Sequence, residues 1–170
     1  MKLPRPIRTS ALCARMLAIV LLGTMVSATP AAGAEGSWEW PVSPPHTVTR
    51  SFEAPPTPYS AGHRGIDIAL HPGAPVTAPE AGVVHFAGVV VDRPVLSIAH
   101  EGDLLSSFEP LDAVVAEGES VLKGQVVGTV STGGHCSATC LHLGVRLHGQ
   151  YVSPLLLLGE VPPAVLLPLE

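Results

Sequence analysis

The stretch Gly62-His63-Arg64-Gly65-Ile66-Asp67-Ile68-Ala69 is the one around which the rest of the chain is organised. It places a histidine and a carboxylate four residues apart, with a glycine between them. On a straight strand four residues span roughly 13 Å, which is too far for His63 and Asp67 to share one ion. A turn or bulge at Arg64-Gly65 would fold the two side chains together, because glycine accepts backbone angles that other residues avoid. A surface histidine with an Asp67–Arg64 ion pair is the alternative interpretation.

A second stretch, Cys140-Leu141-His142-Leu143-Gly144-Val145-Arg146-Leu147-His148, alternates apolar and polar residues. A period of two predicts a half-buried strand with His142 on its polar face. Gly144 leaves room beside it for a close approach. Two imidazoles and one carboxylate are a known type of zinc-ligand set, with a fourth position open. If the two stretches meet in space, the sequence therefore predicts a zinc site formed by His63, Asp67 and His142.

The pattern from Ile66 onward is that of β-structure. Short, valine-rich apolar runs are bounded by Gly, Pro or Asp, as strands in sandwiches and barrels are. No window of eleven or more residues has the spacing of an amphipathic helix free of Gly and Pro. We therefore predict an all-β, sandwich- or barrel-like domain, with strands near residues 48–52, 83–84, 89–91, 95–98, 114–115, 126–130 and 155–158.

The first 34 residues are typical of a secretory signal peptide. A basic start precedes an apolar run at 16–26, and Ala32-Gly33-Ala34 is an A-x-A cleavage pattern. The apolar run is shorter than the roughly 20 residues that a membrane span needs. We expect a protein without a stable membrane anchor after cleavage. An uncleaved anchor is the alternative.

The charge balance and the cysteine content bear on the possible partners and on the compartment of the protein. After residue 34, five basic residues stand against 14 acidic ones, a formal net charge of −9. This balance argues against nucleic acid as a partner. Cys13 lies in the leader, which leaves Cys136 and Cys140 as an even pair. In an oxidising compartment a disulfide between them is the expected state, and free thiols are the alternative.

Taken together, these motifs resemble those of the lysostaphin-like (LytM-type) zinc peptidoglycan endopeptidases, over roughly residues 40–158. The first motif of that family, H-x(3)-D, matches residues 63–67. Its last motif, H-x-H-F-E-V-R followed by D-P, corresponds to residues 140–146 with Ser153-Pro154 downstream. Residues 95–100 resemble the strand that precedes the third signature of the family. Residues 117–125 resemble the V-x-x-G-x-x-V-x-x-G turn of the family.

The resemblance implies a β domain of the lysostaphin-type (duplicated hybrid motif) kind, with Zn²⁺ held by His63, Asp67 and His142. The ion would act as a Lewis acid on a peptide carbonyl and lower the pKa of its bound water. Two histidines that the family uses for proton transfer are replaced here, by Pro110 in a Y-x-H-L motif and by Cys140 in H-x-H. A positioned acid or base contributes typically about 10²- to 10⁴-fold. These departures predict little turnover unless other residues take over.

Three residues are candidates for that compensation. Glu109 adjoins the position of Pro110, although neighbours along a strand face opposite ways. His135 lies in the glycine-rich loop that enters the His142 strand, from where it can turn toward the metal. The third candidate is Cys140. As a free thiolate it would be a fourth zinc ligand and make the site structural. In a disulfide with Cys136 it would be chemically inert.

These observations lead to two functional hypotheses. The first is a secreted, cell-wall-associated zinc metalloendopeptidase that cleaves peptide cross-bridges of peptidoglycan. The second is a catalytically inactive zinc-binding module that binds the cell wall or regulates a partner wall hydrolase. A metal-free scaffold is a third alternative. In each case we expect a signal peptide (1–34), a proline-rich lead (35–60), a LytM-type domain (61–160) and an apolar tail (161–170).

Overall fold

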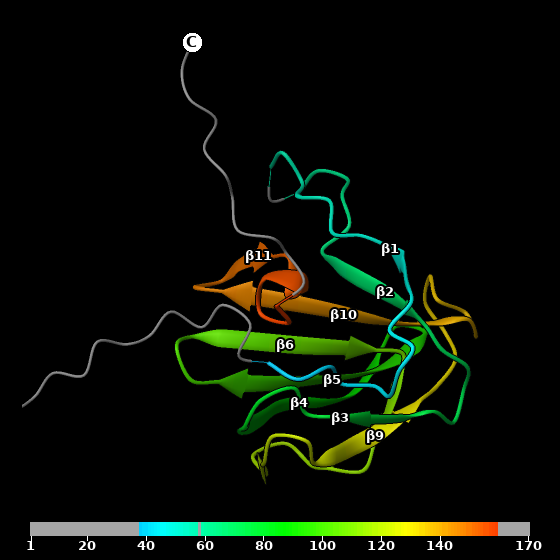
Figure 1. Ribbon diagram of the computed structural model, residues 1–170, viewed down its shortest axis with the longest axis vertical. Coiled ribbons are helices and arrows are strands. Elements are labelled where there is room, and N and C mark those ends of the chain that lie inside the picture. Colours follow the sequence, from blue (N-terminus) through cyan, green and yellow to red (C-terminus); the bar gives the residue numbers. More distant parts are fainter. Residues whose placement is uncertain (1–37, 58, 160–170) are drawn as a thin grey trace, which may run out of the picture. The chain divides into compact units, whose positions relative to one another are not determined.

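The computed structural model describes residues 38–57 and 59–159, and over them the prediction of an all-β domain is confirmed (Figure 1). The predicted signal peptide and apolar tail lie outside the described residues. No helix in the described part of the chain is long and apolar enough to cross a membrane. The elements are β1 (Val48–Arg50), β2 (Gly65–Ala69), β3 (Pro75–Thr77), β4 (Gly82–Val90), β5 (Arg93–His100), β6 (Leu104–Glu109), β7 (Leu111–Ala113), β8 (Ser120–Val121), β9 (Val126–Val130), β10 (Cys140–Leu147), β11 (Gln150–Val152) and a 3₁₀ turn, η1 (Pro154–Leu156).

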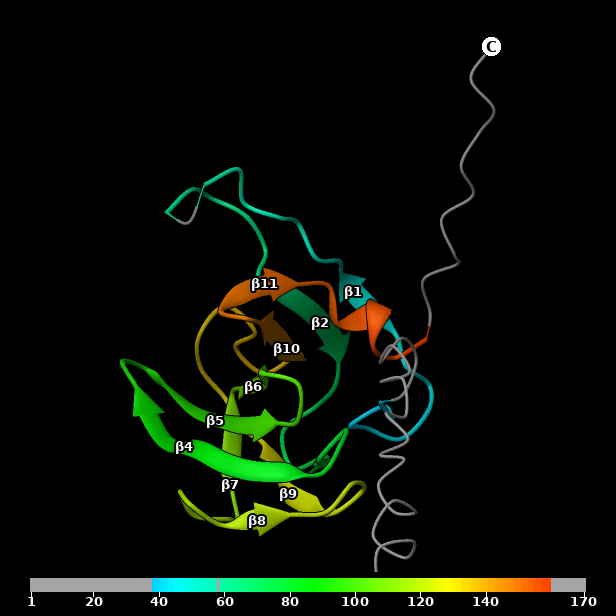
Figure 2. The same ribbon diagram turned by 90° about the vertical axis from the view of Figure 1, so that its left-hand side faces the viewer.

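The strands form two antiparallel sheets. The large sheet has the order β1-β2-β10-β6-β5-β4-β8, and β11 also pairs with β10. The small sheet has the order β3-β9-β7. Figure 1 shows β10 between β2 and β6, and in the turned view of Figure 2 the strands β7, β8 and β9 lie beneath β4 and β5.

The core lies where the apolar sides of the two sheets meet. Phe108 and Leu96 from the large sheet are fully buried, as are Val76 and Val127 from the small one. All four belong to one continuous apolar cluster. Burying one such side chain contributes about 1.5–3 kcal/mol. The position of β6, which carries Phe108, is therefore strongly determined, and with it the position of its neighbour β10.

β10 is buried on both faces, so the prediction of a half-buried strand was wrong. Every residue from Cys140 to Val145 is buried. One face packs into the apolar core through Leu141 and Leu143. On the other face His142 is buried as well, and the rings of His63 and His135 lie against it. The alternation of residue types correctly separated the two faces, but period two alone does not show what covers the polar one.

Other predicted strands differ from the structure in position. Val114 and Val115 lie in the bend after β7, and residues 155–158 form η1 and a turn in place of a strand. Pro154 begins η1, because proline suits the first position of a helical turn. β6 was not predicted, since its sequence Leu-Leu-Ser-Ser-Phe-Glu lacks the valine-rich character on which the other predictions relied.

Candidate metal centre

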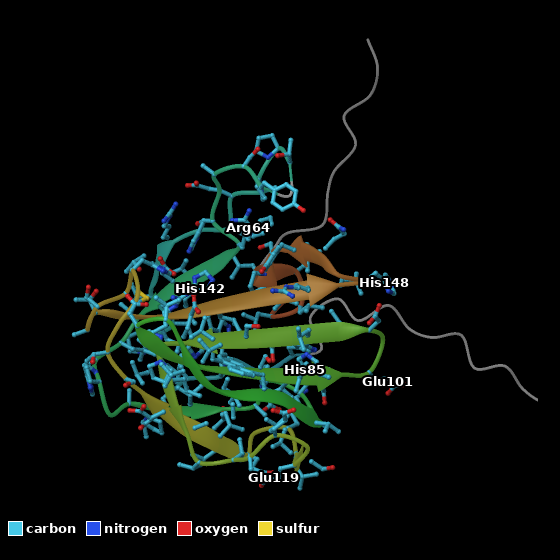
Figure 3. All side chains as sticks on the ribbon, turned by 180° about the vertical axis from the view of Figure 1, so that it is seen from behind. Arg64, His85, Glu101, Glu119, His142 and His148 are labelled. Carbon is cyan, nitrogen blue, oxygen red and sulfur yellow. A yellow bond between two sulfur atoms is a disulfide. The ribbon has the colours of Figure 1, made fainter. Side chains whose placement is uncertain are left out.

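Asp67 and His142 face each other across two paired strands. In the antiparallel register of β2 and β10 they are direct partners. Side chains of direct partners lie on the same face of a sheet. The two side chains meet there, with His142 Nδ1 2.8 Å from Asp67 Oδ1. His85 and His148 lie away from His142, and His148 is at the other end of β10 (Figure 3).

His63 joins this pair from just outside β2. Its backbone makes an isolated antiparallel bridge with Glu53, and the chain bends at Arg64 before β2 begins. The His63 ring donates from Nδ1 to the carbonyl oxygen of Ser51 at 2.7 Å. Because a carbonyl only accepts, this bond assigns the proton of the neutral ring to Nδ1 and leaves a lone pair on Nε2. His63 Nε2 lies 3.0 Å from Asp67 Oδ1.

Gly65 is required between these residues for reasons of space. A Cβ atom at this position would lie 2.7 Å from Nε2 of the His142 ring, and it would also overlap the backbone oxygen of Leu143. The bend expected at Arg64-Gly65 is present, at Arg64. The glycine therefore allows the imidazole of β10 to lie against the backbone of β2.

His135 enters the same cluster from the loop between β9 and β10. Its Nε2 atom lies 3.0 Å from Asp67 Oδ1. The ring is 42% exposed, whereas the side chains of Asp67 and His142 are 6% and 11% exposed. A disulfide between Cys136 and Cys140 ties this loop to the start of β10. Of the two alternatives for the cysteines, the structure has the disulfide.

The four side chains present their ligand atoms to one point. His63 Nε2, Asp67 Oδ1, His135 Nε2 and His142 Nδ1 all lie within 4.8 Å of one another. Three ring nitrogens approach the same carboxylate oxygen at 2.8–3.0 Å, and His63 Nε2 is 3.1 Å from His142 Nδ1. Hydrogen bonds cannot satisfy all of these contacts, since Nε2 of neutral His63 has no proton to donate.

A divalent cation fits this donor set. Bonds of about 2.0–2.1 Å to nitrogen and oxygen in a tetrahedral zinc site separate the ligand atoms by about 3.3 Å. The separations between the ring nitrogens and the carboxylate oxygen are close to this value. Imidazole and carboxylate are also the donors that zinc takes in catalytic sites. The residues present are therefore suited to hold Zn²⁺.

The electrostatics of Asp67 agree with this arrangement. Burial by itself raises the pKa of the Asp67 carboxyl, but hydrogen bonds with His142 and His135 and the charge of nearby imidazoles outweigh it. The net effect holds the pKa of Asp67 well below its usual range. The group is therefore a carboxylate at neutral pH, which is the state that binds a metal.

Glu109 lies near the centre but does not belong to the group of four. It is the direct partner of His142 on the β6 side, so its side chain lies on the same face of the sheet. Its carboxylate accepts a hydrogen bond from Arg93 Nε at 2.9 Å. Neither Arg93 nor the Ser51 carbonyl that orients His63 was predicted from the sequence. A backbone carbonyl leaves no signal in the sequence, and the role of Arg93 depends on the pairing of β5 with β6.

The comparisons with known proteins agree on the kind of domain. The sequence model of peptidase family M23 matches residues 61–154. An uncharacterized protein of Mycobacterium tuberculosis is 39% identical over 150 residues, which cover 85% of this chain and 60% of that protein. The murein hydrolase activator NlpD of Escherichia coli is 33% identical over 122 residues, covering 70% of this chain and 30% of the relative. The chain thus spans about 60% of the length of the mycobacterial relative.

Solved structures show the same fold. A zinc-containing peptidase from Vibrio cholerae aligns with a TM-score of 0.60 and 25% identity, over 69% of this chain and 39% of that one. The catalytic domain of the prophage-encoded M23 protein EnpA from Enterococcus faecalis, crystallised as a mutant, aligns with a TM-score of 0.58 and 26% identity. That alignment covers 70% of this chain and 96% of the EnpA domain.

Proposed function

The chain belongs to peptidase family M23, and from this premise we propose that it is a zinc metalloendopeptidase that hydrolyses peptide cross-bridges of peptidoglycan. The observation that carries the proposal is the convergence of His63, Asp67 and His142 on one point, with the lone pair of His63 Nε2 directed into the cluster. A peptidoglycan-related role is also supported by the murein hydrolase activators among the relatives.

We propose His63, Asp67 and His142 as the fixed metal ligands. All three are buried, and strand pairing or a backbone bridge holds each of them. Zn²⁺ bound there would polarise the peptide carbonyl and acidify the attacking water. The Ser51 carbonyl keeps the His63 ring in the tautomer that ligation needs, as hydrogen bonds to the second ring nitrogen of ligating histidines usually do.

His135 is the proposed proton acceptor in place of the two histidines that this chain lacks. It is the exposed member of the four and lies on a loop, so it can yield its position near Asp67 to substrate and water. Imidazole is the side chain that enzymes use most often for proton transfer. The Cys136–Cys140 disulfide keeps the ring within reach of the centre.

Glu109 is the competing proton acceptor, and a pair of variants separates the two. Its carboxylate is engaged by Arg93 and is therefore less free to move to the reacting atoms. Replacing His135 with Ala should lower kcat by about 10²-fold or more. Glu109→Gln keeps the shape of the side chain and should leave most of the activity. The opposite ranking of the two variants would assign the role to Glu109.

The same proposal includes the location of the protein. A secreted protein associated with the cell wall agrees with the predicted signal peptide (1–34) and with the disulfide, because disulfides persist in oxidising compartments. Peptidoglycan is then the partner, and residues 61–160 are the functional domain, to which the lead contributes β1 and the Ser51 carbonyl.

A second function is favoured by one specific observation. Pro110 and Cys140 stand where the resembled family has its two proton-transferring histidines, and the Escherichia coli relative is called a murein hydrolase activator. A module that binds zinc and the wall, and regulates a partner wall hydrolase without cutting, would need none of the missing histidines.

Digestion of purified peptidoglycan tests both functions. The zinc-loaded protein should release new peptide amino groups, and His63→Ala should release none. His71→Ala is the matched control, since His71 is exposed and its Nδ1 atom is hydrogen-bonded to the neighbouring carbonyl of Pro72. Hydrolysis that persists in chelator would refute the zinc mechanism. Wall binding without release of amino groups by the zinc-loaded protein would favour the regulatory function.

A further inference from the structure

A second set of metal-ligating atoms overlaps the first. One carboxylate oxygen of Asp67, one ring nitrogen of His135 and the sulfur atoms of Cys136 and Cys140 also lie within 4.8 Å of one another. Cys136 Sγ is 3.8 Å from His135 Nε2, and both cysteines are buried. Two members, Asp67 and His135, belong to both sets. The sulfur atoms are therefore next to the metal centre, and their oxidation state decides what they can do there.

While the disulfide is intact, the sulfur atoms are poor ligands, because zinc binds the thiolate. Reduction by a phosphine changes this. The S–S bond is cleaved, the phosphine takes the oxygen of one water molecule and becomes the phosphine oxide, and the two protons of that water yield two thiols. Each thiol then loses its proton on binding a metal. Thiolates are the soft donors that select zinc, with bonds of about 2.3 Å.

The loop keeps its thiols near the centre by bonds that do not involve the disulfide. Gly133 and Ser137 exchange two backbone hydrogen bonds, at 2.9 and 3.1 Å. The carbonyl of Cys136 accepts from the backbone and from the side chain of Thr139, at 2.9 and 3.0 Å. Cys140 lies on β10, two residues before His142, and so on the same face of the sheet.

We propose that the reduced chain holds the metal with Cys136 and Cys140 together with Asp67 and His135, so that the disulfide determines which ligand set is used. The inference rests on the proposed function, in that the oxidised centre is taken to bind zinc through His63, Asp67 and His142. The two sets cannot each hold an ion at the same time, because both need Asp67. Four protein ligands are typical of closed, structural zinc sites, so the reduced form holds zinc and does not cleave.

Cobalt binding to three forms of the protein tests this. The forms are the oxidised protein, the phosphine-reduced protein freed of reductant under nitrogen, and Cys136→Ser/Cys140→Ser. Co²⁺ reports sulfur ligation through a thiolate-to-cobalt charge-transfer band in the near ultraviolet. Only the reduced wild type should show this band. Zinc competition should find the reduced wild type at least about tenfold tighter than the double serine variant, which has neither thiolates nor disulfide.

His63→Ala separates this inference from the proposed function, because His63 belongs to the first set alone. Oxidised His63→Ala should lose cobalt binding, whereas reduced His63→Ala should keep both binding and the sulfur band. A reduced wild type without the band, or one that binds like the double serine variant, overturns the inference. Oxidised protein that binds no metal refutes the proposed function, and a sulfur band in the reduced protein would then still support the second ligand set.

Discussion

At the scale of single residues, the metal centre depends on which ring nitrogen of each histidine carries the proton. The Ser51 carbonyl assigns the His63 proton to Nδ1, and Nε2 is then the atom directed at Asp67. His142 uses the opposite nitrogen, Nδ1, for the same purpose. At His63 the lone pair is directed at the centre because a backbone carbonyl holds the other ring nitrogen, which is the usual way in which proteins prepare histidine ligands.

Gly65→Ala should damage the centre although the side chain it adds is a single methyl group. The new Cβ atom meets the His142 ring and the Leu143 carbonyl, and backbone atoms cannot easily move away. We expect a loss of about 1–3 kcal/mol in the free energy of unfolding and weaker zinc binding. Urea denaturation and zinc competition measure these effects.

Gly144→Ala is the matched control, because Gly144 pairs directly with Gly65 in the sheet. A Cβ atom there meets its nearest neighbour, the Arg64 carbonyl oxygen, at 3.2 Å, so the cost should be smaller. Equal losses in the two variants would show that any methyl group at this pair is harmful and that contact with His142 is not the cause.

The three proposed fixed ligands and His135 should differ in their contribution to zinc affinity. His135→Ala should weaken binding by about 10- to 100-fold, because its ring lies on an exposed loop and three ligands remain. His63→Ala should cause a larger loss, since it removes a buried ligand. Zinc competition with a chromophoric chelator gives both values. A His135→Ala variant that binds as weakly as His63→Ala would make His135 a fixed ligand as well.

At the scale of elements, β10 organises the centre. It pairs with β6 along one edge and, along the other edge, with β2 and then β11. The apolar face of β10 is anchored in the core, and its polar face carries His142 to the point where Asp67 arrives from β2. Glu109 reaches the same face from β6, so three neighbouring strands each contribute one polar side chain.

Another histidine, His100 of β5, links neighbouring strands of the large sheet outside the metal centre. Its Nδ1–H donates to the Ala81 carbonyl at 2.9 Å, and Nε2 accepts from the hydroxyl of Ser106 at 2.8 Å. Burial lowers the pKa of His100, and it outweighs the opposing hydrogen bond with Ala81. The ring that links β5, β6 and the start of β4 is therefore neutral in the folded protein.

Stability should consequently fall as the solution is acidified. The folded-state pKa of His100 is below that of the unfolded chain, so the unfolded chain takes up a proton first. The contribution of neutral His100 is complete above about pH 6.5 and is lost as the pH falls through the lowered folded-state pKa. Urea denaturation of metal-free protein at about pH 7.5 and about pH 5 measures the loss.

The variant for this comparison is His100→Gln, whose amide replaces the ring donor without titrating. Its free energy of unfolding should fall less between the two pH values than that of the wild type. An identical fall in both proteins would assign the pH dependence to other groups.

At the scale of the whole molecule, the metal centre connects segments that are far apart in the sequence. His63 follows the proline-rich lead, Asp67 lies on β2, and His135 and His142 come from the loop and strand near the end of the domain. An ion that binds only the folded arrangement stabilises it by mass action, by about 2.7 kcal/mol at a free concentration one hundred times Kd.

Removal of zinc should therefore lower the melting temperature of the oxidised protein by roughly 10 °C, given the unfolding entropy of a domain of this size. Calorimetry with saturating zinc and with chelator measures the shift. Asp67→Asn should melt at the same temperature under both conditions. A wild-type melting temperature unaffected by chelator would contradict metal binding at this centre.

The sequence by itself determined the all-β class, the two faces of β10 and the residue types at the centre, because period-two alternation and the H-x(3)-D and C-x-H motifs are local patterns. The family followed from the same motifs. Only the tertiary structure decided that His135 arrives beside Asp67, that a carbonyl at Ser51 orients His63, and that Glu109 shares a face with His142 while bound to Arg93. The physical reason is that side-chain alternation is set within one strand, whereas strand register and loop packing are set by contacts between segments that are distant in the sequence.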